Sequence, residues 1–132
     1  MWEYISTGFK VITAGVAALC TYLFGAWDVP LGVLCAVVVI DYITGVVGAI
    51  VQGNLSSAVG FKGIAKKVAI FAVVAVGHLI GVAAASPEIG ASVVGFYIAN
   101  EAISILENCG KIGLPLPDKL VQILEQLKNK DK

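Results

Sequence analysis

Four long apolar runs follow one another along this chain with very little between them, and this spacing is what most limits its fold. The hydrocarbon core of a bilayer is about 30 Å thick, and a helix needs roughly 17–25 apolar residues to cross it. The runs that reach this length cover residues 11–27, 31–51, 68–85 and 89–106. The sequence therefore predicts an all-α integral membrane protein with about four antiparallel transmembrane helices.

The links between the runs predict how the helices connect. Residues 28–30 join the first pair and residues 86–88 join the last pair, and links this short favour antiparallel helical hairpins. A longer segment, 52–67, joins the two hairpins. We therefore expect a four-helix transmembrane domain at 1–106 and a separate tail at 107–132.

Composition supports a lipid environment. Hydrophobic residues make up 58% of the 132 residues and charged residues 14%, whereas soluble domains have about 45–50% apolar and about 25% charged residues. A soluble domain of this length could not bury so much apolar surface. The formal net charge is zero and no basic face is clustered, so a nucleic-acid partner is not expected.

The lysines predict the orientation in the membrane. If the helices alternate in direction, every lysine falls on one side: Lys10, then Lys62, Lys66 and Lys67 in segment 52–67, then the lysines of the tail. By the positive-inside rule this side is the cytoplasm, so both termini are predicted to be cytoplasmic. Lys62, Lys66 and Lys67 are expected to set topology and contact lipid headgroups, with specific gating contacts as the alternative.

The tail contains a second pattern. After glycines and prolines that interrupt the fourth run, residues 118–128 are typical of a short amphipathic helix, with an apolar stripe of Leu120, Ile123, Leu124 and Leu127. This helix is too short to span a bilayer. It is expected either to lie in the membrane interface or to pack against other subunits.

Polar residues inside the predicted spans are the candidate functional residues, because ionisable groups in lipid face protein or water. These residues are Asp41, Thr44, His78, Asn100 and Glu101. Asp41 lies ten residues before the end of its span and His78 ten residues after the start of its span, so both are placed roughly 15 Å deep. An Asp41–His78 pair, within one subunit or between two, is one hypothesis, and separate positions along a wet lumen are the other.

Small residues share the helix faces that carry these polar groups. The glycines concerned are Gly45, Gly48, Gly77, Gly81 and Gly95. Spacing of small residues at four-residue steps lets helix backbones approach closely in lipid. These positions are therefore candidates for helix packing, within one subunit or between copies.

Catalytic patterns are missing from the sequence. The chain has one histidine, no glycine-rich phosphate loop and no set of side chains typical of nucleophilic catalysis. We therefore expect no enzyme activity, no catalytic residue, no metal site and no cofactor.

Three stretches together resemble a known family. They are Asp41-Tyr-Ile-Thr-Gly45, the segment 59–67 that ends in Ala-Lys-Lys67, and the segment 97–108 that runs into Gly113-Leu-Pro-Leu-Pro117. In order and spacing the chain, over roughly residues 35–128, is similar to the toxin secretion/phage lysis holins of Gram-positive bacteria and their phages.

This resemblance implies a function. Members of the family are small proteins of the bacterial cytoplasmic membrane that self-associate into homo-oligomers and open lesions. An endolysin or a toxin then crosses as cargo without stable binding, and an antiholin is a further possible partner. Two other classes stay open at this point: a small ion or proton channel or transporter, and an antiholin-like regulator.

Overall fold

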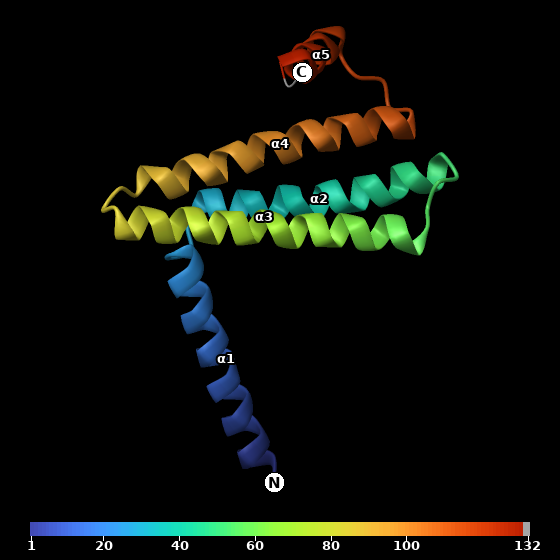
Figure 1. Ribbon diagram of the computed structural model, residues 1–132. Coiled ribbons are helices and arrows are strands. Elements are labelled where there is room, and N and C mark those ends of the chain that lie inside the picture. The colour runs from blue at the N-terminus through green and yellow to red at the C-terminus, as the bar shows by residue number, and fades with distance from the viewer. Residues whose placement is uncertain (131–132) are drawn as a thin grey trace.

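The computed structural model describes residues 1–130, and it is helical through most of that range (Figure 1). The helices are α1 (Trp2–Phe24), α2 (Val29–Val51), α3 (Ser57–Ala83), α4 (Glu88–Ile112) and α5 (Asp118–Lys130). Helices α1 to α4 are each long and apolar enough to cross a membrane. The predicted all-α fold, with four such helices and a short C-terminal helix, is confirmed.

Local signals in the sequence set several helix ends. The Asp28 carboxylate accepts a hydrogen bond of 2.9 Å from the backbone N–H of Leu31, and Ser56 caps α3 in the same way through Val59 N–H at 3.1 Å. Such caps satisfy N–H groups that have no partner within the helix. At the other end of the chain, α4 stops at Gly113, whose φ of 103° is readily adopted only by glycine.

Helices α2, α3 and α4 lie side by side and form the body of the molecule (Figure 1). Helices α2 and α4 run in the same direction, and α3 is antiparallel to both. The buried core is supplied by α2 and α3: Leu31, Leu34, Val38, Ile70 and Val74. Half-buried side chains of α4, including Tyr97 and Ile98, pack against this core. We call these three helices the bundle.

Helix α1 behaves differently, because it extends away from the bundle along most of its length (Figure 1). None of its residues is buried, and it packs against α3 only near its own C-terminus. There the ring of Phe24 stands edge-on to that of Phe71, with centroids 6.2 Å apart. The chain turns at Gly25, whose φ is 79°. The short link therefore does not close α1 and α2 into the expected packed hairpin, since Gly25 directs α1 outward.

The helices also extend beyond the apolar runs. Helix α3 begins at Ser57, so most of segment 52–67 is an N-terminal extension of this helix, and only 52–56 lie between α2 and α3. Apolar periodicity marks only the part of a helix that meets hydrocarbon or core, and the end turns of a helix do not show it.

The apolar stripe expected in the tail falls on α5. Leu120 and Ile123 of this stripe are described, whereas the side chains of Leu124 and Leu127 lie outside the described residues.

The candidate packing glycines differ in their surroundings. A β-carbon at Gly81 would lie 2.9 Å from the backbone oxygen of Ser86, and one at Gly77 would lie 2.9 Å from a methyl group of Val93. Gly45 and Gly48 lie at ordinary contact distance from α4. Gly95 has nothing within 4 Å of such an atom. Gly77 and Gly81 are thus the points where α3 meets α4 and its preceding turn most closely.

Gly81→Ala should destabilise the bundle by about 1–3 kcal/mol, because the added methyl group meets a backbone oxygen that cannot rotate away. The measurement is reversible unfolding in detergent micelles, followed by circular dichroism. Gly95→Ala is the matched control, since it gains helix propensity of about 0.5–1 kcal/mol without a clash. Equal stability of the two variants would contradict the close approach at Gly81.

Candidate functional site

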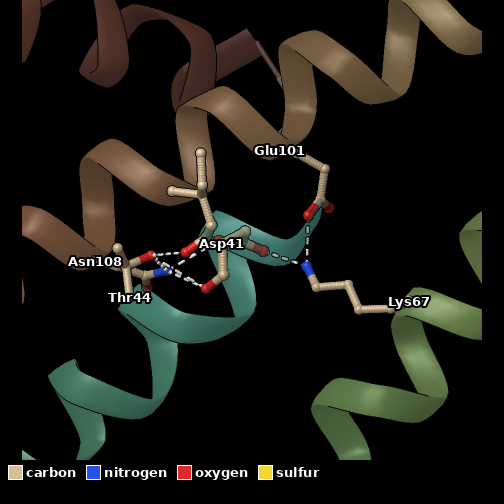
Figure 2. A network of polar contacts seen from close by, with 6 residues as sticks. Asp41, Thr44, Lys67, Glu101 and Asn108 are labelled. Atoms are coloured by element: carbon tan, nitrogen blue, oxygen red, sulfur yellow. Dashed lines mark hydrogen bonds and ion pairs between the residues drawn. The ribbon is translucent and has the colours of Figure 1, made fainter. Parts of the chain in front are cut away.

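Three ionisable side chains from three helices meet inside the bundle. Figure 2 shows Lys67 of α3 reaching between Asp41 of α2 and Glu101 of α4. Asp41 is 6% exposed and Glu101 is fully buried, while the Lys67 side chain is 13% exposed. We call these three residues, with Thr44 and Asn108 beside them, the polar cluster.

Hydrogen bonds join all five members. The Lys67 ammonium donates to one carboxylate oxygen of Asp41 and to Oε2 of Glu101. The Asn108 amide donates to Oδ1 of Asp41 at 2.9 Å, to the Asp41 carbonyl at 3.1 Å and to the Thr44 hydroxyl at 3.0 Å. Thr44 in turn donates to the carbonyl of Ile40 at 2.8 Å. The cluster therefore links all three helices of the bundle through polar contacts (Figure 2).

The register of the helices explains why these side chains meet. Asp41 lies ten residues before the end of α2 at Val51, and Lys67 lies ten residues after the start of α3 at Ser57. Antiparallel neighbours joined by a short loop bring such positions to the same level. On α4, Glu101 and Asn108 are seven residues apart, which is about two helical turns, so both face the bundle.

The charged groups of the cluster stabilise one another by pairing. Each ionisable residue at the centre of a membrane helix costs about 2.5–3.5 kcal/mol on the insertion scale. A buried ion remains tolerable when it is paired and hydrogen-bonded. One lysine here serves two acids, however, and Oε1 of Glu101 is buried with no hydrogen-bond partner among the described residues.

A cleft of about 180 Å³ leads to the cluster from the end of the bundle where α2 and α3 are joined. Its lining includes Tyr42 of α2 with Gly60, Gly63 and Lys66 of α3, and at its inner end Asp41, Lys67, Ser104 and Asn108. The glycines leave room beside the Tyr42 ring. The cleft gives water a route toward Lys67 and Asp41, while Glu101 stays enclosed.

Within one chain, Asp41 and His78 do not form the hypothesised pair. Asp41 bonds to Lys67 and Asn108, whereas His78 lies near the opposite end of the bundle, beside Gly25 and Gly90. It lines a separate, mostly apolar pocket of about 820 Å³. The apolar run starts at Val68, but α3 begins at Ser57, so the residue of α3 at the level of Asp41 is Lys67.

The other candidate residues are divided between the cluster and the surface. Asp41, Thr44 and Glu101 are brought together, whereas Asn100 is exposed on α4. Lys62 and Lys66 are exposed, but Lys67, which the sequence grouped with them, points into the bundle. Asn108 was not among the candidates. Its spacing of seven residues from Glu101 was the signal that could have found it.

Within residues 1–130, no group of three or more His, Cys, Asp or Glu side chains is placed to hold a metal ion. The arrangement is that of a charged network which holds helices together and which water can approach from one end.

Comparison with known proteins gives a consistent result. The sequence model of the bacteriophage holin family matches residues 18–129. An uncharacterized protein of Halalkalibacterium halodurans is 45% identical over 90% of this chain and 93% of its own length. An uncharacterized protein of Clostridium acetobutylicum is 43% identical, with 91% and 98% covered. An uncharacterized 14.9 kDa protein encoded in the nagH 3′ region of Clostridium perfringens is 40% identical, with 97% and 96% covered. No solved structure matches the chain.

Lys67→Met should destabilise the bundle by about 3–5 kcal/mol, because it removes the cation that pairs with the buried acids Asp41 and Glu101. Lys66→Met is the matched control: this neighbour is exposed, and its loss should change stability by less than about 0.5 kcal/mol. Both are measured by reversible unfolding in micelles. Adding Asp41→Asn and Glu101→Gln to Lys67→Met should restore much of the loss, since the cluster is then polar but uncharged. Similar stability of the two lysine variants would refute the ion pairs.

Proposed function

The chain belongs to the bacteriophage holin family, and on that premise we propose that it is a holin, which self-associates in the bacterial cytoplasmic membrane and forms lesions. An endolysin or a toxin then passes through these lesions without binding stably. The observation that carries the proposal is the polar cluster: a charged network buried within helices whose outer faces are apolar.

Such a helix bundle suits a protein that must exist in two environments. While the three helices are packed, Lys67 neutralises part of the acidic charge and the bundle can disperse in lipid. If the helices separate, the same side chains can line a water-filled pore. Most of these polar groups are hydrogen-bonded in the packed bundle and can be hydrated when the helices separate, which brings the two states closer in free energy, as a switch between them requires.

The exposed surfaces favour association between copies. Helix α1 presents large apolar side chains on all sides, among them Trp2, Phe9, Ile12 and Leu19. On α4, Gly95 has open space around it and its neighbours Ala91 and Ala99 are exposed. Small exposed residues allow a second helix to come close in lipid, where packing rather than hydrophobicity drives association.

The lysines support an orientation with both termini in the cytoplasm. Lys62 and Lys66 stand exposed near the start of α3, close to the α2–α3 loop. Cationic residues are enriched on the cytoplasmic side of membrane proteins. In this orientation the cleft that reaches the polar cluster opens toward the cytoplasm.

Inducible expression in bacteria with a co-expressed cytoplasmic endolysin tests the function. We expect abrupt lysis after a delay, because lesions large enough for a folded enzyme must first assemble. Expression without the endolysin should stop growth but leave the cell wall intact. The measurement is culture turbidity, together with release of a cytoplasmic reporter enzyme.

Three other outcomes would contradict the proposal. Ion conductance at low expression without release of the endolysin would indicate a channel or transporter, a function that a buried charged cluster with a water route also suits. A delay of lysis when this chain is co-expressed with an active holin would indicate an antiholin-like regulator. A protein that stays monomeric in membranes and never permeabilises cells would also refute the proposed holin function.

A further inference from the structure

The polar cluster is not balanced in charge if all three of its ionisable groups are charged. Asp41 and Glu101 are two acids, and Lys67 is the one cation in contact with them among the described residues. Lys66 lines the outer part of the cleft but is itself exposed, so its charge is hydrated by water. Tyr42 also lines the cleft and adds no cation to the cluster. One negative charge is therefore left over inside the bundle.

The unpaired oxygen Oε1 of Glu101 indicates which acid carries the excess negative charge. Oε2 of Glu101 accepts from Lys67, but Oε1 is buried and has no hydrogen-bond partner among the residues that the structure describes, and Glu101 is fully enclosed. Asp41, by contrast, has partners on both carboxylate oxygens, Lys67 on one and Asn108 on the other. An ionised carboxylate with one unsolvated oxygen is costly in a low-dielectric interior, whereas a protonated carboxyl is neutral.

We propose that the polar cluster is a proton-binding site, in which Asp41 and Glu101 hold one proton between them while Lys67 keeps its charge. The bound proton makes the cluster neutral overall and resides mainly on Glu101. It is taken up from water and returned to water through the cleft that opens at the α2–α3 loop.

Loss of this proton destabilises the packed bundle. The cluster then carries a net negative charge between α2, α3 and α4, and solvation of that charge favours separated, hydrated helices over packed ones. The native bundle binds one more proton than the unfolded chain over the pH range in question. By linkage, its stability therefore falls as pH rises through that range.

Infrared spectroscopy of the full chain in phospholipid vesicles tests the site directly. At about neutral pH, we expect the carbonyl band of a protonated carboxylic acid in the wild type and its disappearance as the pH is raised. Glu101→Gln, which mimics the protonated side chain in shape and charge, should lack the band. Glu88→Gln is the control on the same helix, because Glu88 is exposed, and it should keep the band.

The pH dependence of unfolding provides a second measurement. Between about pH 6 and about pH 9, the unfolding equilibrium constant of the wild type should rise by up to about tenfold per pH unit, the limit for one proton. The slope should be absent in Glu101→Gln and retained in Glu88→Gln. If Glu101→Gln fails to fold, the wild-type titration of the infrared band still decides the question.

Two results would overturn the proposal. A wild-type spectrum without the protonated carboxyl band would show that Glu101 is ionised and that its free oxygen binds water. A band that persists unchanged in Glu101→Gln would show that the proton belongs elsewhere. Neither result bears on endolysin release, so this proposal and the proposed function can fail separately.

Discussion

The ammonium group of Lys67, held between Asp41 and Glu101, is the contact on which the rest of the bundle depends. It joins α3 to α2 and to α4 at one level, and Asn108 closes the connection between α2 and α4. In lipid the hydrophobic effect does little to hold helices together, so polar contacts and close packing must set their arrangement. The apolar core of Leu34, Val38 and Val74 lies around this fixed point.

Helix α1 takes no part in the Lys67 ion pairs, and it is held to the bundle much less closely. It has no partner comparable to Lys67, and it meets the bundle mainly through the Phe24–Phe71 ring contact at its C-terminal end. The remainder of α1 is exposed and mostly apolar. The molecule thus combines a bundle joined by polar contacts with a mostly exposed, apolar helix α1. In the proposed holin, the bundle is the part that changes between packed and separated helices, and α1 contacts lipid or other copies of the chain.

The two ends of the bundle also differ in chemistry. At the α2–α3 loop the cleft leads to charged groups and is flanked by lysines. At the α3–α4 turn the larger pocket around His78 is mostly apolar and lies beside the hinge at Gly25. This polarity along the bundle axis agrees with the asymmetric placement of lysines in the sequence. The cleft reaches the polar cluster from the α2–α3 end of the bundle.

Length, apolar runs and the positions of charge by themselves determined that this is a helical membrane protein, because the bilayer demands long apolar helices and allows few alternatives. They also identified Asp41, Thr44 and Glu101 as special, since polar groups inside such runs require a reason. Only the tertiary structure decided that Lys67 rather than His78 is the partner of Asp41, and that Asn108 belongs to the site. Pairing depends on where each helix begins and on which faces meet, and segment 57–67, which precedes the apolar run 68–85, does not by itself reveal the register of α3.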